Sequence, residues 1–255
     1  MKILIRHSPE DVATTAAQIF AQHITPGARI GLATGSTPLL MYQELIRKFQ
    51  RGDLTFAQVD AFLLDEYVGL PKEHRESYYA TIRREFTEHI DIADTAVHSP
   101  DGTHTHPCQA ARQYQELIDA APIDIQLLGI GANGHLGFNE PTSALTSVTR
   151  VKTLHPRTVQ DNARFFDSDQ DVPHHVITQG LGTIQKASHL LLLATGEAKV
   201  EAVKAMVEGP LSAFCPASVL QLHPQATVVL DEAAAAALSD KDYYRFVEEH
   251  QHLVS

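Results

Sequence analysis

The sequence of 255 residues contains no tryptophan and only two cysteines, Cys108 and Cys215. Neither cysteine has a CxxC partner, so the sequence predicts neither a paired-thiol redox motif nor a cysteine metal site. The 15 histidines are scattered, and no set of Cys and His has the spacing of a zinc site. We therefore predict no bound metal and two reduced, structural thiols, which are typical of a cytoplasmic protein.

A long hydrophobic run and an excess of basic residues are also absent. No apolar segment approaches the roughly 20 residues of a membrane span, and residues 1–5 lack the apolar core of a signal peptide. The formal net charge is −11, which disfavours nucleic acid and anionic membranes as partners because both are bound by a basic surface. A small anionic molecule needs only a few local donors and is compatible with this charge.

The sequence does contain short apolar runs that alternate with segments of helical period. Several runs are apolar at successive residues, as expected for strands buried on both faces of a parallel sheet. Strands are predicted over 2–5, 29–33, 61–64, 124–130, 189–193 and 227–230. Helices are predicted from Pro9 onward with Ser8 as N-cap, and over 39–49, 77–89, 107–120, 199–208 and 240–250, with a further helix-forming run at 233–237.

This order of elements predicts an α/β fold with a doubly wound, mostly parallel sheet and helices on both faces. There is no internal repeat and no low-complexity linker, so we expect a single domain over residues 1–255. Residues 157–173 are polar, with charges and a proline but no strand pattern. Within an α/β enzyme such a segment is typical of a lid, and the alternative is an ordinary surface helix and loop.

The first candidate site is the glycine-rich segment 129–141, Gly-Ile-Gly-Ala-Asn-Gly-His-Leu-Gly-Phe-Asn-Glu-Pro. It follows an apolar run directly, so it is predicted at the carboxyl end of a buried strand, where open α/β sheets place their chemistry. His135 suits proton transfer near neutrality, and Glu140 can orient the imidazole and stabilise its charge. The segment predicts acid–base chemistry on a small polar substrate. The alternative is a tight turn with an exposed histidine.

The second candidate site is the segment Thr34-Gly35-Ser36-Thr37-Pro38, where a strand runs into a helix that Pro38 is expected to open. Backbone N–H groups at a helix start, together with hydroxyl groups, form a site for an anion. The segment is neither a Walker A loop nor a GxGxxG motif, so it predicts a monophosphate site. The alternative is that Ser36 or Thr37 only caps the helix.

Two carboxylates and two separate cations complete the set of candidates. Asp65 and Glu66 end an apolar run, and a carboxylate shielded there by apolar neighbours can have a raised pKa and act as a base. One of the two is expected to be structural, as a cap of the next element. Lys199 lies at the start of a predicted helix and Arg164 lies in the polar segment; each suits a contact with an anion, although either alone is more often a solvated side chain. Together these groups fit a sugar phosphate.

These motifs, in this order, resemble those of glucosamine-6-phosphate deaminases. The resemblance runs nearly end to end and includes residues 34–38, 64–71, 77–79, 129–141, 150–153, 162–166 and 195–199. It implies a Rossmann-like sheet and the conversion of glucosamine 6-phosphate and water to fructose 6-phosphate and ammonia in amino-sugar catabolism. It also implies that no metal or redox cofactor takes part.

The resemblance assigns a role to each candidate. Asp65 is the expected base that moves the proton of C2, and His135 the group that opens the pyranose ring, assisted by Glu140 and Asn133. Residues 157–173 are the expected lid. The phosphate is expected to bind to Gly35, Ser36, Thr37, Arg164 and Lys199.

Asn133 departs from the family pattern, because many members have Asp at this position. An amide can hydrogen-bond to His135 and orient it, but it carries neither charge nor a transferable proton. A relay with two carboxylates is therefore not expected, and Glu140 is the carboxylate that this loop offers to a charged imidazole.

A regulatory site is a further implication. Larger members form hexamers that N-acetylglucosamine 6-phosphate activates, and Ser143, Arg150 and Lys152 match residues of that site. Ala144 stands where the pattern has a second serine, and the C-terminal tail diverges. A homo-oligomer and activation by this ligand are both open alternatives.

Two other functions compete with deamination. A 6-phosphogluconolactonase resembles this fold, but its loop typically continues toward Leu-Phe-Pro and it tends to have Asp-Glu-Arg, where this chain has Gly-Phe-Asn-Glu-Pro and Asp-Glu-Tyr. A non-catalytic sugar-phosphate sensor is the second alternative, and the presence of Asp65, His135 and Glu140 together argues against it.

Overall fold

The computed structural model describes residues 1–154, 166 and 172–250. Its main feature is a seven-stranded sheet in which every pair of neighbouring strands is parallel. The strands, in their order across the sheet, are β1 (Lys2–Arg6), β10 (Ala226–Asp231), β9 (Leu190–Ala194), β6 (Ile125–Gly129), β2 (Arg29–Leu32), β3 (Asp60–Leu63) and β5 (Val97–His98). All strands predicted from the sequence are confirmed to within a residue or two at each end. Strand β5 was not predicted because two residues are too few to show a period.

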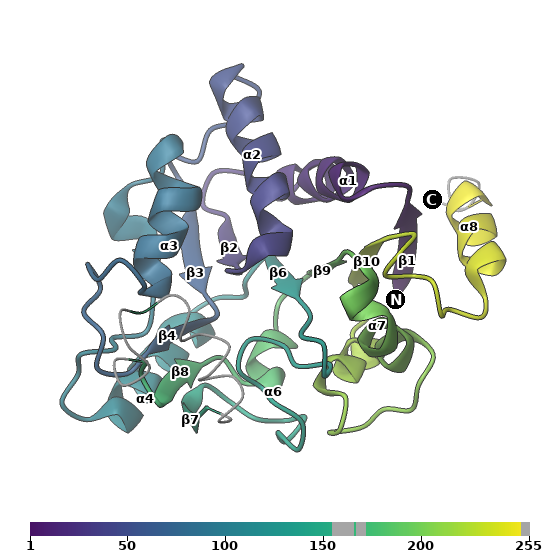
Figure 1. Ribbon diagram of the computed structural model, residues 1–255. Coiled ribbons are helices and arrows are strands. Elements are labelled where there is room, and N and C mark those ends of the chain that lie inside the picture. Colours follow the sequence, from purple (N-terminus) through teal and green to yellow (C-terminus); the bar gives the residue numbers. More distant parts are fainter. Residues whose placement is uncertain (155–165, 167–171, 251–255) are drawn as a thin grey trace.

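Helices cover both faces of this sheet, which confirms the predicted doubly wound α/β fold. Figure 1 shows α1 (Pro9–Ala21) and α2 (Ser36–Gln50) above the strands, α3 (Tyr78–Glu85) beside β3, and α4 (Pro107–Asp119) and α6 (Leu181–Ile184) below them. Helix α7 (Val200–Val207) follows β9, and α8 (Lys241–His250) packs against the edge strand β1. Ser8 caps α1 as predicted, accepting a hydrogen bond of 3.1 Å from the N–H of Asp11.

The predicted helical run at 233–237 is wrong, because these residues form turns. The carboxylate of Asp231, at the end of β10, accepts hydrogen bonds from the N–H groups of Ala234 and Gly196. These hydrogen bonds hold the end of β10 against the loop that follows β9 and give the turn after β10 a side-chain acceptor. Helix propensity alone therefore does not decide the structure here.

The core explains why the strand predictions succeeded. Strands β9 and β10 are buried at every residue, so their sequences are apolar almost without interruption. The buried face of α1 consists of Val12, Ala13, Ala16, Ala17 and Phe20, and its three alanines let the helix approach the sheet closely. Among the described residues, no helix has the length and apolar character needed to cross a membrane.

A second, small antiparallel sheet lies beside the carboxyl end of β3. It consists of β4 (Asp65–Tyr67), β8 (His175–Thr178) and β7 (Arg150–Thr153) in that order. Asp65 lies opposite Thr178 in this pairing. None of these strands was predicted, because they have three or four residues and β7 is only partly buried.

The topology places the loops that follow β2 and β6 at one crevice. After β2 the next strands of the sheet, β3 and β5, are added on one side of it. After β6 the next strands, β9 and β10, are added on the opposite side, where β1 forms the edge. Strands β2 and β6 are neighbours, so the loops at their carboxyl ends diverge and leave an opening between them. The expected lid at 157–173, with Arg164, lies almost entirely outside the described residues.

We expect Gly31→Ala to destabilise the protein by about 1–3 kcal/mol, because an added Cβ at this position collides with a buried side chain. Gly31 of β2 lies beside Gln126 of β6, and a Cβ built on Gly31 overlaps the side-chain amide of Gln126. The measurement is the free energy of unfolding in urea. The control is the same change in a Gln126→Ala background, where the collision partner is gone and the cost of Gly31→Ala should fall. An equal cost in both backgrounds would contradict this explanation.

Candidate active site

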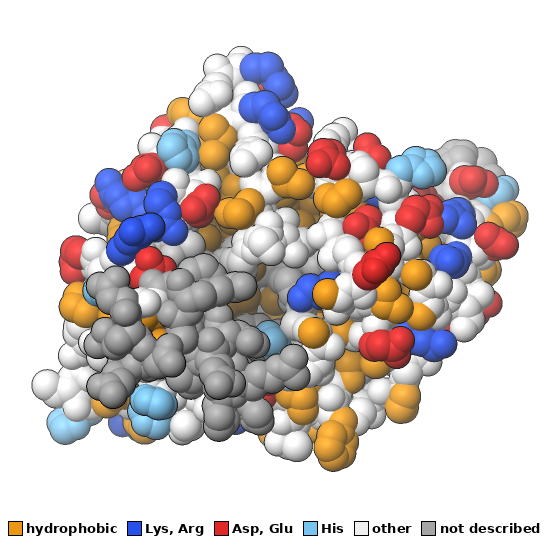
Figure 2. All heavy atoms as spheres, viewed as in Figure 1, with side chains coloured by type: hydrophobic (Ala, Val, Ile, Leu, Met, Phe, Trp, Pro, Cys, Tyr) orange, Lys and Arg blue, Asp and Glu red, His pale blue; other side chains and the backbone are white. Residues whose placement is uncertain are grey.

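A cleft of about 440 Å³ opens at the carboxyl ends of the parallel strands. Its walls come from the loops after β2, β3, β6 and β9, and Figure 2 shows this face of the molecule hollowed near its centre. The predicted residues that line the cleft are Gly35, Ser36, Thr37, Asp65, His135 and Lys199. Segments that are far apart in the sequence are thus brought together at the edge where the fold predicts a ligand site.

The first turn of α2 forms one wall of the cleft. Gly35 precedes the helix with a φ of +109°, a conformation that favours glycine, and Ser36 and Thr37 are the first helical residues. Pro38 is therefore the third residue of the helix and not the first, as was predicted. The N-cap of α2 is Gly35, and among the described residues no side chain caps the helix. The alternative role of Ser36 or Thr37 as an N-cap is therefore wrong, and the first N–H groups of the helix are available to an anion.

Lys199 lies on the opposite side, in a one-turn 3₁₀ helix (Glu197–Lys199) before α7. Its Nζ donates a hydrogen bond of 2.7 Å to the carbonyl oxygen of Ile130. Ile130 belongs to the glycine-rich segment 129–141, called the histidine loop from here on. Burial lowers the pKa of Lys199. The contact directs the ammonium group toward the cleft that this residue lines.

The two neighbouring carboxylates have separate roles. Glu66 accepts hydrogen bonds of 2.9–3.0 Å from the backbone N–H groups of Tyr67, Tyr78 and Tyr79. It therefore caps the start of α3 and is the structural member of the pair, as was expected of one of them. Asp65 lines the cleft and is only 5% exposed. Burial, and then the charge of Glu66, raise the pKa of Asp65 to about 8.

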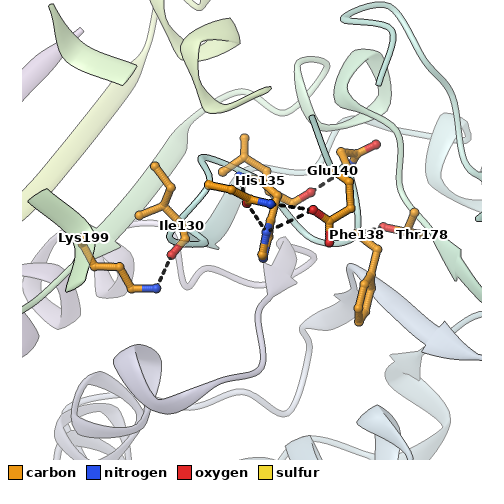
Figure 3. A network of polar contacts seen from close by, with 9 residues as sticks. Ile130, His135, Phe138, Glu140, Thr178 and Lys199 are labelled. Atoms are coloured by element: carbon orange, nitrogen blue, oxygen red, sulfur yellow. Dashed lines mark hydrogen bonds and ion pairs between the residues drawn. The ribbon is translucent and has the colours of Figure 1, made fainter. Parts of the chain in front are cut away.

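The histidine loop forms a chain of hydrogen bonds that ends in the cleft (Figure 3). The side-chain nitrogen of Asn133 donates to Oε2 of Glu140 at 2.7 Å, and its oxygen lies 2.6 Å from Nδ1 of His135. Because a carboxylate only accepts hydrogen bonds, the orientation of the Asn133 amide is determined, and Nδ1 of His135 must carry a hydrogen. Nε2 is then the nitrogen that takes up a proton.

The electrostatics of His135 favour this neutral form. Burial lowers its pKa, Lys199 lowers it further, and Glu140 acts in the opposite direction at 3.8 Å from Nδ1. A neutral imidazole with its Nδ1 hydrogen held by Asn133 is prepared to act as a base through Nε2. Asn133 and Glu140 thus lie behind His135 and act on the cleft through it.

Comparison with known proteins shows the family of this chain. Residues 2–229 match the family described as glucosamine-6-phosphate isomerases/6-phosphogluconolactonase. The chain belongs to this family. It is 63% identical over 252 residues to a glucosamine-6-phosphate deaminase of Corynebacterium kroppenstedtii, covering 98% of both chains. It is 55% identical over 253 residues to one of Rhodococcus opacus, again covering 98% of both chains.

Solved structures support the same family. A structure described as a monomeric glucosamine-6-phosphate deaminase superposes with a TM-score of 0.89 at 41% identity, covering 92% of this chain and 99% of that chain. A 6-phosphogluconolactonase from Trypanosoma cruzi superposes with a TM-score of 0.74 at 21% identity, covering 93% and 97%. The second comparison shows the fold alone.

The residues that match the family's regulatory site do not line the cleft. Ser143 is buried, and among the described residues its hydroxyl has no hydrogen-bond partner. Arg150 and Lys152 lie on β7, where a guanidinium nitrogen of Arg150 donates to the side-chain oxygen of Asn139 at 2.9 Å. Their regulatory role stays a prediction.

Tyr78 and Phe138 also line the cleft, although no role was predicted for either. Tyr78 stacks on Tyr67 with ring centroids 4.8 Å apart, and the two hydroxyl groups lie 3.1 Å apart. The cap that Glu66 provides to α3 holds Tyr78 at the cleft that Asp65 also lines. The run Ser-Tyr-Tyr at 77–79 was the available signal, but its meaning depends on this tertiary contact.

We expect Asp65→Asn to stabilise the protein at high pH and to have little effect at low pH. Burial raises the pKa of Asp65 from the ordinary 3.8 of an aspartate to about 8 in the folded state. Its contribution to stability is therefore full below pH 4 and is lost as pH rises to about 8. Asparagine does not titrate. The difference in unfolding free energy should grow from near zero at pH 4 to about 2–5 kcal/mol at pH 9.

The measurement is urea unfolding of both proteins between pH 4 and pH 9. Glu66→Gln is the matched control, because it removes a cap of α3 and should destabilise the protein. A difference between Asp65→Asn and the unchanged protein that does not vary with pH would contradict the raised pKa.

Proposed function

We propose that this protein is a glucosamine-6-phosphate deaminase that converts glucosamine 6-phosphate and water to fructose 6-phosphate and ammonia. The observation that carries the proposal is the convergence of a buried aspartate, a histidine of determined tautomer and the start of α2 on one cleft. High identity to proteins named as this deaminase supports it. We place the reaction in sugar-phosphate metabolism, as a step of amino-sugar catabolism.

Binding begins with the phosphate. The N–H groups of Ser36 and Thr37 and the ammonium of Lys199 face the cleft from two sides, and we assign the phosphate to them. Gly35 permits the turn before the helix, and Arg164 is proposed as a further contact from outside the described residues. A fixed phosphate positions C1 and C2 of the sugar, so its binding energy supports the chemical step.

Ring opening is assigned to His135. Its Nε2 accepts the proton of the anomeric hydroxyl and delivers a proton to the ring oxygen, which yields the open-chain aldehyde. The imidazolium formed in between is stabilised by Glu140 through the amide of Asn133. One carboxylate is sufficient for this because Asn133 transmits orientation while Glu140 supplies the charge.

The isomerisation is assigned to Asp65. Its carboxylate removes the proton from C2 while O1 takes a proton from the ammonium group on C2, which gives a neutral enolamine. Asp65 then returns a proton to C1, the nitrogen becomes an iminium at C2, and water adds there as ammonia leaves. General acid–base catalysis is most efficient when the pKa of the catalytic group lies near the working pH, and a pKa of about 8 meets this condition near neutrality.

We expect Asp65→Asn to reduce ammonia release by about a thousandfold or more, because the amide cannot remove the C2 proton. Affinity for a non-reacting sugar phosphate should change by less than about threefold, since the phosphate contacts are on other loops. In the unchanged protein kcat/KM should rise with pH up to about 8 as Asp65 ionises. Deuterium uptake at C1 from D2O in the variant at the original rate would remove Asp65 from this role.

We expect His135→Gln to slow turnover of the cyclic substrate by about 100-fold or more. An analogue without O4 and O5 cannot close a ring, so its turnover should change much less. The comparison of the two substrates is the measurement. Equal slowing of both would show that His135 does not act in ring opening.

Lactone hydrolysis is the alternative activity that the fold permits. The structural similarity to 6-phosphogluconolactonases is at 21% identity or less among those compared, whereas deaminases reach 63%. A direct assay of ammonia release from glucosamine 6-phosphate, beside hydrolysis of 6-phosphogluconolactone, distinguishes the two. Loss of both activities in the unchanged protein would favour a sugar-phosphate sensor.

A further inference from the structure

Asn139 is fully buried within the histidine loop, between Phe138 and Glu140. Both hydrogens of its side-chain amide are used: the nitrogen donates to the carbonyl oxygen of Leu136 at 2.9 Å and to that of Gln179 at 2.8 Å. Its side-chain oxygen accepts from Arg150 at 2.9 Å. Since carbonyls only accept and a guanidinium only donates, the orientation of this amide is determined.

The bond to Leu136 closes the loop that carries the proposed ring-opening groups. Leu136 follows His135 directly, and its carbonyl oxygen accepts hydrogen bonds from both the backbone and the side chain of Asn139. Glu140 is the next residue after Asn139. The side chain of Asn139 therefore determines the separation between the histidine and the carboxylate that acts on it.

The bond to Gln179 connects this loop to the strand that carries Asp65. The carbonyl oxygen of Gln179 accepts from Asn139, while its backbone N–H donates to the carbonyl oxygen of Leu64 at 2.8 Å. Leu64 directly precedes Asp65. The backbone of Gln179 thus bridges Asn139 and Leu64, and through Leu64 it connects Asn139 to Asp65. Asn139, Gln179 and Leu64 are all buried, so these hydrogen bonds are shielded from solvent.

The loop approaches Asp65 so closely that small shifts matter. Gly137 has a φ of +54°, and a Cβ at this position would lie 3.2 Å from Oδ2 of Asp65 and 3.1 Å from the hydroxyl oxygen of Thr178. The N–H of Phe138 donates to that same hydroxyl at 3.2 Å. The backbone of the histidine loop is therefore in contact with the side chain of the base and with the strand opposite it.

We infer that Asn139 is a positioning residue, which holds the His135–Glu140 loop at a fixed distance from Asp65 so that ring opening and proton removal act on one bound sugar. The inference depends on the proposed function. Asn139 does not line the cleft, so it acts through the groups on either side of it. Arg150 orients its amide and is the outer end of the same network.

The test is the Asn139→Asp variant, which keeps the size of the side chain and its contact with Arg150 but replaces both donors by an acceptor. Two backbone carbonyls then face an oxygen, and the loop must move. We expect kcat for ammonia release to fall by about 100-fold, because small misplacements of catalytic groups have effects of this size. KM should change by less than about threefold, since the phosphate contacts are outside the network.

Gln221→Glu is the control for replacing an amide by a carboxylate, at an exposed position. The side-chain nitrogen of Gln221 likewise donates to two backbone carbonyls, those of Met206 and Gly209, at 2.8 and 3.0 Å and away from the cleft. This variant should lower the melting temperature and leave kcat unchanged. The inference would be overturned if Asn139→Asp kept the kcat of the unchanged protein, or if its loss of kcat were no larger than that of Gln221→Glu.

Arg150→Ala extends the test to a residue at the half-exposed end of the network, where folding is less at risk. It should lower kcat by about tenfold at unchanged KM, and it should have no further effect in an Asn139→Ala background, because Arg150 acts through Asn139. Additive losses in the double variant would contradict this. If the unchanged protein releases no ammonia, the proposed function fails as well, whereas an active protein with an insensitive Asn139 refutes only the positioning role.

Discussion

The burial of the Asp65 carboxylate is the constraint on which the rest of the site depends. A carboxylate at the end of a parallel strand is ordinarily solvated, but here β4 pairs with β8 and the histidine loop lies against it. Its ionised form is therefore disfavoured, and the pKa rises to about 8. The same desolvation should weaken the folded protein at high pH, and it gives Asp65 the basicity that the proposed removal of the C2 proton requires. Stability and the proposed activity are therefore opposed at this residue.

Glu66 shows how the fold accommodates a second carboxylate beside the first. Its three backbone hydrogen bonds replace the water that it loses on burial. Those bonds also stabilise the start of α3 and hold Tyr78 at the cleft. The ring of Tyr78 therefore forms part of the cleft wall near Asp65. The charge of Glu66 in turn contributes to the raised pKa of Asp65.

The amide of Asn133 links the chemistry of the histidine loop to its geometry. With a carboxylate on one side and an imidazole on the other, only one amide orientation and one histidine tautomer satisfy every hydrogen bond. The amide orientation of Asn139 is determined in the same way, because its nitrogen donates to two carbonyls and its oxygen accepts from a guanidinium. Two asparagines, neither of which needs to touch substrate, thus determine where the proton of His135 lies and how far the imidazole stands from Asp65.

The main sheet and most helices followed from the sequence, because strands that are buried on both faces, such as β9, must be apolar at every position. The loop motifs likewise identified Asp65, His135, Glu140 and the start of α2 as candidates, since glycines and polar groups after an apolar strand have few other uses. The small sheet of β4, β8 and β7 was not predicted, because its strands are short and β4 pairs with β8, which lies more than a hundred residues away in the chain. For the same reason only the tertiary structure decided which of Asp65 and Glu66 lines the cleft and which caps α3, and that Asn139 hydrogen-bonds to both Leu136 and Gln179. Hydrogen bonding and desolvation depend on neighbours in space that the local sequence does not specify.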